Sequence, residues 1–281
     1  MASPGAGTGG ENMIRMVIVD VDGTLVTQEK VLTKEAVEAA QQLRAAGVTL
    51  SLTSGRPPRG MRMLVEPLRL EGQIAGFNGG VYVNPDMSVV ATHLLAPDVA
   101  REAMRLILDK GLDAWLYTPD EWLVRKKDAP HVAREAWTVK FEARITPTFP
   151  EEALSNAAKI VGVSDDQALV AECEKAAQAA LGERASAARS QPYYLDVTHP
   201  KANKGEVVLT LSKLLDIPTE EIATIGDMPN DVLMFKKSGL SIAMGNASDE
   251  VKRQASVATA SNEENGFAKA MREFVLKGRM S

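Results

Sequence analysis

An apolar segment that ends in two aspartates constrains the fold of this chain more than any other feature. Residues 17–19 are Val-Ile-Val, apolar without alternation, as in a strand buried on both faces of a parallel sheet. The segment continues as Asp20-Val21-Asp22-Gly23-Thr24, in which Gly23 permits a sharp turn. Ligands bind at the carboxyl ends of strands in open parallel sheets, and buried carboxylates there are costly unless a cation or a chemical task requires them. The segment therefore predicts an α/β fold with a functional site beside Asp20 and Asp22.

Composition indicates a globular protein and excludes several classes of partner. The chain has 281 residues, 45% hydrophobic and 25% charged, which suits one large domain or two moderate ones. Its formal net charge of −5 argues against a nucleic-acid partner. We expect no membrane partner, because no segment approaches the roughly 18 apolar residues that cross a bilayer. The single cysteine, Cys173, cannot form an internal disulfide and is expected to be buried. A cytoplasmic monomer or homodimer fits these features.

The first residues differ in amino-acid composition from the rest of the chain. Residues 1–12 are rich in Gly, with Ala and Ser, and have neither a basic start nor an apolar stretch. They do not have the pattern of a signal peptide. We expect residues 1–12 to form a disordered leader.

Alternating strand and helix patterns on both sides of a distinct middle block predict two domains. Strand-like and helix-like segments alternate with short loops before residue 84 and again after residue 195, a pattern typical of a parallel sheet. The block between them has hairpin-like and Ala-rich helical segments of its own. We therefore expect a Rossmann-like core over residues 13–83 and 196–281, interrupted by an inserted α+β domain over residues 84–195.

Three further polar clusters resemble the aspartate pair in their position. Ser54-Gly55-Arg56 follows the second expected strand, and Lys204 begins an expected helix over residues 204–215. Asp227 and Asp231 follow another expected strand, within Gly226-Asp227-Met228-Pro229-Asn230-Asp231. Strand ends and helix starts of an open parallel sheet can converge on one crevice. The clusters therefore predict a single site.

The residue types in these clusters suit phosphoryl transfer. A carboxylate can act as a nucleophile through an aspartyl-phosphate, and carboxylate oxygens are the ligands that Mg²⁺ prefers. Ser54 can donate a hydrogen bond to a phosphate, and Lys204 supplies a positive charge. Each residue also has an ordinary alternative: Ser54 as a helix cap, Lys204 and Arg56 on the surface, Asp227 and Asp231 as turn acids. All these alternatives would have to hold independently, which makes their conjunction improbable.

The set of motifs resembles the haloacid dehalogenase superfamily of phosphotransferases. The resemblance covers nearly all of residues 14–276, in the family's order and with similar separations. An insertion between the second and third motifs is similar to that of the Cof-type sugar-phosphate phosphatase branch. Asn78-Gly79-Gly80 and Ala243-Met244-Gly245-Asn246-Ala247 strengthen this placement.

The resemblance implies a catalytic role for the acidic residues. Asp20 would attack phosphorus and ligate Mg²⁺. Asp22 would act as general acid and then as general base, and its main-chain carbonyl would be a metal ligand. Asp227 would be the acidic metal ligand of the last motif, and Asp231 would contact the ligands of the metal rather than the metal itself.

The resemblance also implies which residues hold the substrate. The phosphoryl group would be held by Ser54, Gly55, Lys204 and Asn230. Arg56, Asn78 and Gly79 lie where the family contacts the rest of the substrate. We expect the inserted domain to be a cap that sets substrate specificity, with Trp122, Arg125 and Lys126 as candidate contacts.

These observations favour a Mg²⁺-dependent phosphatase that acts on small phosphorylated metabolites, sugar phosphates above all. Asp22 can shuttle a proton to an ester oxygen and then activate water, which points to phosphatase or phosphomutase chemistry. A phosphomutase similar to phosphomannomutase is the alternative within the superfamily. A protein that binds phosphorylated metabolites without catalysis is a further alternative, which the intact acidic residues disfavour.

Overall fold

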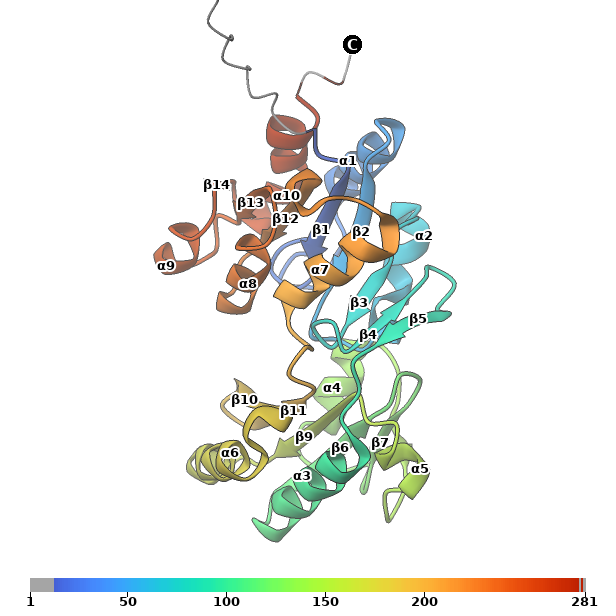
Figure 1. Cartoon of the computed structure of the whole chain (residues 1–281), viewed down its shortest axis with the longest axis vertical. Helices are drawn as coiled ribbons and strands as arrows, with labels where there is room; N and C mark the ends of the chain where they lie inside the picture. The colour runs from blue at the N-terminus through green and yellow to red at the C-terminus, as the bar shows by residue number, and fades with distance from the viewer. Residues whose placement is uncertain (1–12, 278, 280–281) are drawn as a thin grey trace, which may run out of the picture.

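The chain folds into two bodies that are joined by two neighbouring connections (Figure 1). The computed structural model describes residues 13–277 and 279. The expected leader, residues 1–12, lies outside the described residues. Within the described part, no helix is long and apolar enough to span a membrane.

The larger body, the core domain, is built on an eight-stranded sheet in the order β14-β13-β12-β1-β2-β3-β4-β5. The strands from β14 to β3 run parallel, whereas β4 and β5 are antiparallel to their neighbours. The strands are β1 Met16–Asp20, β2 Thr49–Thr53, β3 Ile74–Gly76, β4 Val81–Val83, β5 Val89–Thr92, β12 Ile222–Gly226, β13 Leu240–Ala243 and β14 Val257–Ala258.

Helices cover both faces of the core sheet, which explains the unbroken apolar run of β1. Val17 and Val19 pack in one apolar cluster with α1 and α10, whereas Met16 and Ile18 pack in another with α7 and α8. Every residue of β1 is buried, as the sequence predicts for a strand covered on both sides. The α-helices of the core are α1 Lys34–Ala45, α2 Val65–Leu68, α7 Lys204–Leu215, α8 Val232–Phe235, α9 Asp249–Lys252 and α10 Gly266–Ala270.

Short helical turns complete the core domain. The prolines after Arg56 start a 3-10 helix rather than a long α-helix, and α2 follows it directly. A π-helical turn extends α10. These turns are η1 Pro58–Leu64, η3 Thr219–Glu221, η4 Pro229–Asp231, η5 Asn262–Glu264 and η6 Met271–Val275.

The smaller body, the cap domain, has a six-stranded sheet in the order β10-β11-β9-β6-β7-β8. The sheet is antiparallel except where β7 pairs with β8. Its strands are β6 Asp113–Tyr117, β7 Trp122–Val124, β8 Arg144–Ile145, β9 Lys159–Val163, β10 Ser186–Gln191 and β11 Tyr194–Thr198. Its helices are α3 Pro97–Asp109, α4 Val132–Val139, α5 Glu151–Leu154, α6 Gln167–Leu181 and the 3-10 turn η2 Gly182–Arg184.

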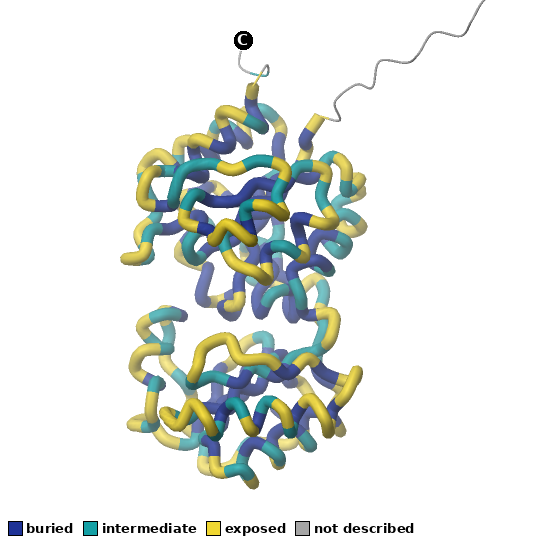
Figure 2. Tube along the Cα trace, turned by 90° about the vertical axis from the view of Figure 1, so that its left-hand side faces the viewer, coloured by how far each residue is buried: buried dark blue, intermediate teal, exposed yellow. Residues whose placement is uncertain are grey.

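The two faces of the cap sheet have different partners. Leu116, Ile160 and Leu195 pack with α3 and α6, together with the buried Cys173. The alternate residues of the same strands, such as Tyr117 and Val161, belong to the apolar cluster of the core domain. The open face of the cap sheet is therefore turned toward the core domain, and Figure 2 shows buried segments on both sides of the waist between them.

The structure moves the expected domain boundary at residue 84. The turn at Asn84-Pro85-Asp86 leads into β5, which pairs with β4 as the last strand of the core sheet. The hairpin keeps β5 beside β4, so β5 belongs to the core sheet. The chain therefore leaves this sheet only after Thr92. At the other end, β11 extends the cap sheet to Thr198, three residues beyond the expected boundary. Residues 93–96 and 199–203 are thus the two connections.

Candidate active site

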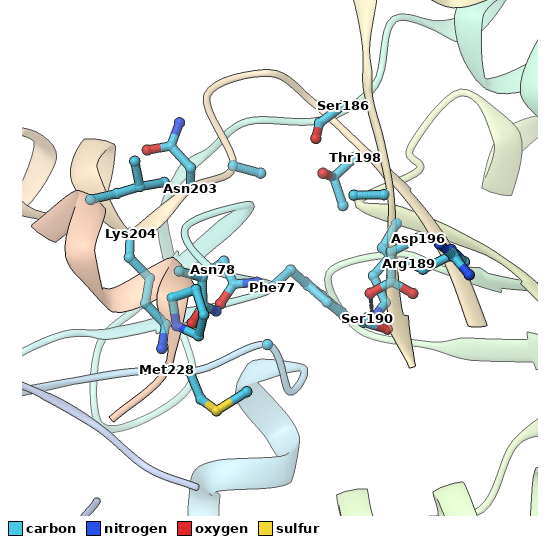
Figure 3. Close-up of a pocket in the computed structure, with 17 residues that line it drawn as sticks. Phe77, Asn78, Ser186, Arg189, Ser190, Asp196, Thr198, Asn203, Lys204 and Met228 are labelled. Atoms are coloured by element: carbon cyan, nitrogen blue, oxygen red, sulfur yellow. Dashed lines mark hydrogen bonds and ion pairs between the residues drawn. The ribbon is translucent and has the colours of Figure 1, made fainter. Parts of the chain in front are cut away.

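The polar clusters of the sequence converge on the side of the core sheet that faces the cap. Asp20 ends β1, Ser54 follows β2, Asp227 follows β12, and Lys204 is the first residue of α7. A cavity of about 280 Å³ is lined by Asp20, Asp22, Ser54 and Lys204 from the core and by cap residues opposite them. A second cavity of about 480 Å³ adjoins it and shares Lys204 (Figure 3). The predicted convergence on one crevice is observed.

A buried lysine holds two of the acidic residues together. Lys204 Nζ donates to Asp20 Oδ1 at 2.6 Å and to Asp231 Oδ1 at 2.5 Å. Burial lowers the pKa of Lys204, but the charges of Asp20 and Asp231 outweigh it, so the pKa lies above its ordinary value. Burial raises the pKa of Asp20 well above its usual range, and the neighbouring carboxylates add to this effect. One ammonium group thus faces more negative charge than it can neutralise.

Asp227 is placed by residues from two other loops. Thr24 Oγ1 donates to Asp227 Oδ1 at 3.0 Å, and Asn246 Nδ2 donates to Asp227 Oδ2 at 3.2 Å and to the Gly23 carbonyl at 2.9 Å. Burial and the charge of Asp231 raise the pKa of Asp227 to about 6. The side chain is therefore oriented but incompletely neutralised.

Asp231 fixes the loop that carries Asp227. Its Oδ2 accepts hydrogen bonds from the backbone N–H of Asp227 at 2.9 Å and of Met228 at 2.8 Å. A Cβ at Gly226 would lie 2.3 Å from Cγ of Asp231, so glycine is required for this approach. Both carboxylate oxygens of Asp231 are thus engaged by the protein, which suits the supporting role that we expect of it.

The side chain of Asp22 is held away from the acidic cluster. Arg56 Nε donates to Asp22 Oδ2 at 2.7 Å, and Lys30 Nζ donates to Asp22 Oδ1 at 2.7 Å. Burial alone would raise the pKa of Asp22, but the hydrogen bonds and charges of Arg56 and Lys30 outweigh it and lower the pKa. In this arrangement Asp22 is a carboxylate, the form that can accept a proton.

The structure places most of the expected phosphate and substrate residues at the cavities. Ser54 is buried, and its Oγ accepts from the backbone N–H of Arg56 at 3.1 Å, a local turn contact rather than a helix cap, because η1 begins at Pro58 without a side-chain cap. Gly55, Asn78 and Asn230 line both cavities. Their contacts with phosphate or substrate remain predictions.

Gly79 is placed differently from the other expected substrate residues. Gly79 is not among the described residues that line the two cavities. A Cβ at Gly79 would lie 2.8 Å from Val207 Cγ2 of α7, and its φ is +100°. The glycine is thus required where this loop passes close to α7 with a left-handed backbone.

The cap residues that face the site are not those expected. Neither cavity is lined by Trp122, Arg125 or Lys126 within the described chain. Trp122 instead stacks on Tyr117 with ring centroids 5.6 Å apart, and Arg125 Nη2 pairs with Asp113 at 3.0 Å. Aromatic packing within the cap accounts for the buried tryptophan. The lining residues from the cap include Trp115, Glu135, Lys159, Ser190 and Asp196.

The acidic cluster fits a divalent cation. Asp20, Asp227 and Asp231 each offer a carboxylate oxygen, and these atoms lie within 4.8 Å of one another. Oxygen donors of this kind suit Mg²⁺, and an added positive charge would offset the repulsion that raises the pKa values of Asp20 and Asp227. Because both oxygens of Asp231 are already hydrogen-bonded, Asp20 and Asp227 are the better candidates for direct ligands.

Comparison with known proteins decides the family. Residues 17–271 match the family described as haloacid dehalogenase-like hydrolase. The chain belongs to this family. The haloacid dehalogenase-like hydrolase is 27% identical to the putative phosphatase YxeH of Bacillus subtilis, over 94% of this chain and 99% of the relative. It is also 27% identical to the 5-amino-6-(5-phospho-D-ribitylamino)uracil phosphatase YcsE of the same organism, over 94% and 96% of the two chains.

A solved structure supports the same placement. A haloacid dehalogenase-like hydrolase from Bacteroides thetaiotaomicron aligns with a TM-score of 0.86 and 28% identity, over 92% of this chain and 98% of that one. The α/β fold and the resemblance to Cof-type phosphatases that the sequence predicted are confirmed. The chain is therefore an enzyme of the phosphoric monoester hydrolase class.

Sequence reasoning missed several residues that shape the site. Lys30 pairs with Asp22, and Thr24 and Asn246 orient Asp227. Asn246 lies in a segment singled out by the resemblance, so a search of that segment for polar side chains could have found it. Nothing in the local sequence marks Lys30, because its role depends on the turn that follows β1.

Proposed function

We propose that this hydrolase is a Mg²⁺-dependent phosphatase of small phosphorylated metabolites, sugar phosphates above all, and that it acts through an aspartyl-phosphate on Asp20. The observation that carries the proposal is the placement of Asp20, which lies at the cavity wall and is hydrogen-bonded by the buried Lys204 at 2.6 Å. The relative YcsE, whose name describes a phosphoribityl substrate, supports this substrate class.

In the first step, a carboxylate oxygen of Asp20 forms a bond to phosphorus as the bond to the leaving-group oxygen breaks. Lys204 engages Asp20 Oδ1, so the other oxygen is free to attack. Ser54 and Lys204 hold the phosphoryl oxygens in line. Mg²⁺, held by Asp20 and Asp227 with the main-chain carbonyl of Asp22, would supply positive charge that offsets the negative charge of the phosphate.

Asp22 would handle the protons of both steps. Its contacts with Arg56 and Lys30 keep it ionised, so on release from them it takes up a proton from solvent and then donates this proton to the departing oxygen in the first step. The resulting carboxylate then takes a proton from water, which attacks the aspartyl-phosphate and releases inorganic phosphate and free Asp20. The proton that Asp22 loses to the leaving alcohol in the first step is replaced by one from water in the second.

Substitution of the nucleophile tests the proposal. Asp20→Asn is expected to reduce Mg²⁺-dependent phosphate release from a panel of phosphate esters by at least about 10³-fold, because an amide is a poor nucleophile. Asp98→Asn, at an exposed position on α3, is the matched control and should retain full activity. Equal activity of Asp20→Asn and the wild type would refute the proposal.

The same assay separates the alternatives. A phosphomutase would convert a sugar monophosphate to its isomer with little release of inorganic phosphate. A non-catalytic binding protein would release none, and Asp20→Asn would change its binding little.

A further inference from the structure

The cap presents one charged pair to the site. Lys159 of β9 and Asp196 of β11 lie on adjacent antiparallel strands, and Lys159 Nζ donates to Asp196 Oδ2 at 2.9 Å. The two side chains are 13% and 19% exposed, and both residues line both cavities. Figure 3 shows Asp196 across the cavity from Lys204. The pair therefore faces the region where the part of a substrate beyond its phosphate would lie.

Several buried polar atoms at this wall have no hydrogen-bond partner in the protein. Asp196 Oδ1 and Trp115 Nε1 are two of them, and Asn78 Oδ1 on the core side is a third. Buried polar atoms normally have partners, so orphaned atoms on residues that line a cavity indicate a ligand with matching groups. Hydroxyl groups of a ligand can donate to Asp196 Oδ1 and accept from Trp115 Nε1.

The positive charges at the cavities are already paired with carboxylates. Every lysine and arginine among the described lining residues is paired with a carboxylate: Arg56 with Asp22, Lys159 with Asp196, Arg189 with Glu174, and Lys204 with Asp20 and Asp231. A second phosphate or a carboxylate on the substrate would have to displace one of these partners. The desolvation of an unpaired charge would disfavour such a substrate.

At the larger cavity, the cap lining other than the pair and Arg189 consists of small residues that are mostly polar. Ser186, Ser190 and Thr198 place hydroxyl groups along the larger cavity (Figure 3). Hydroxyl side chains can pair with hydroxyl groups of a ligand in either direction. The wall thus matches an uncharged chain of hydroxyl groups better than an apolar or an ionic one.

We propose that Lys159 and Asp196 determine specificity by binding the leaving group, and that the preferred substrate is a monophosphate whose leaving group is an uncharged, polyhydroxylated carbon chain. Asp196 Oδ1 accepts a hydrogen bond from a substrate hydroxyl, and Lys159 holds Asp196 in place and donates to a neighbouring one. The inference rests on the proposed phosphatase function and names the side chains that select its substrate.

A matched pair of substrates tests this proposal. A hexitol monophosphate and hexyl phosphate have the same number of carbons and both release an alcohol, but only the first has further hydroxyl groups. The wild type is expected to have a kcat/KM at least about tenfold higher for the hexitol ester, because a charged acceptor left without its donor is costly. A hexose bisphosphate should also be a poorer substrate than the hexitol monophosphate.

Two single variants each break the Lys159–Asp196 pair and are expected to leave the fold intact. Asp196→Asn and Lys159→Gln are expected to reduce kcat/KM for the hexitol ester about tenfold, mainly through KM, and to change hexyl phosphate hydrolysis less than about twofold. Hydrolysis of hexyl phosphate shows that each variant is folded, and having two variants protects against the failure of one. Glu172→Gln, which breaks the exposed Lys110–Glu172 pair of the cap, is the control and should change neither substrate.

The outcomes separate this inference from the proposed function. If the wild type hydrolyses both esters equally, or if the variants lose both equally, the specificity role is overturned and the phosphatase function stands. If no ester is hydrolysed with Mg²⁺, the proposed function fails and this inference fails with it. A selective loss of hexitol phosphate hydrolysis in either variant supports the inference.

Discussion

His93 and His199 stack face to face, with ring centroids 5.6 Å apart and planes inclined by 18°. One histidine lies on each of the two connections between the core and the cap. His93 Nδ1 also lies 3.0 Å from the carbonyl oxygen of Gly79, so the stack is tied to the core. The two connections are thus held side by side at the waist of the molecule.

The stack predicts a dependence of stability on pH. Burial, with added repulsion from His93 and Lys201, lowers the pKa of His199. The unfolded chain then binds a proton at this residue more readily than the folded chain does. Its contribution to stability is fully present above the unfolded pKa of about 6.5 and is lost as the pH falls through the lower pKa of the folded state. Urea unfolding of His199→Asn between about pH 7 and 5 should show a shallower loss of stability than that of the wild type. An unchanged slope would contradict the assignment.

Two glycines with similar backbone angles should respond differently to alanine. Gly23 has φ +82°, and a Cβ there would lie 2.5 Å from Asp227 Oδ2, whereas Gly47 has φ +72° and open space around it. Each substitution is expected to cost about 1–2 kcal/mol of stability through backbone strain. Gly23→Ala should also displace Asp227 and abolish most activity, but Gly47→Ala should remain active. Thermal unfolding measures the loss of stability, and phosphate release measures the loss of activity. An inactive Gly47→Ala would contradict the expected difference between the two glycines.

Removal of Asn246 should weaken metal binding. Asn246 Nδ2 bridges Asp227 Oδ2 and the Gly23 carbonyl, and partners of this kind orient the ligands of a metal. Asn246→Ala is expected to raise the Mg²⁺ concentration for half-maximal activity by about tenfold. The turnover number at saturating Mg²⁺ should change little. Asn156→Ala, at an exposed position of the cap, serves as the comparison. The same Mg²⁺ titration curve for both variants would argue against a role for Asn246.

Lys204 should contribute strongly to stability as well as to activity. Its side chain is 2% exposed and pairs with Asp20 and Asp231, so Lys204→Met leaves two buried carboxylates without their cation. We expect a loss of about 3 kcal/mol in the free energy of unfolding, measured in urea with EDTA present. Adding Asp20→Asn to this variant should restore part of the loss. Lys110→Met, which breaks an exposed pair, should cost far less; an equal loss in both lysine variants would disprove the structural role.

The convergence of the residues on the core side of the site could be predicted because its signals are local. Asp20 ends a strand, Ser54 and Asp227 each follow one, and Lys204 begins a helix, so the topology of a parallel sheet alone brings them together. Helix α1 was also predictable, because Thr33 Oγ1 accepts from the backbone N–H of Ala36 as an N-cap does.

The cap half could not be predicted from local signals. Lys159 begins a strand that otherwise reads as a short apolar run, and Asp196 lies in the middle of a strand and in no motif. Their pairing depends on the register between β9 and β11, which no single segment encodes. Strand β10 was missed for a related reason, because Ser186–Gln191 is small and polar and has four adjacent exposed residues. Strand β5 was assigned to the wrong domain because a hairpin turn does not reveal which sheet its second strand extends.

The closeness of the two connections has a consequence for how such enzymes can diversify. Because His93 and His199 bring the two connections together, the cap, residues 97–198, is a unit that could be replaced by a short loop or by another domain. The cap could therefore be exchanged, in evolution or by engineering, while the core domain keeps the residues that we propose to be catalytic.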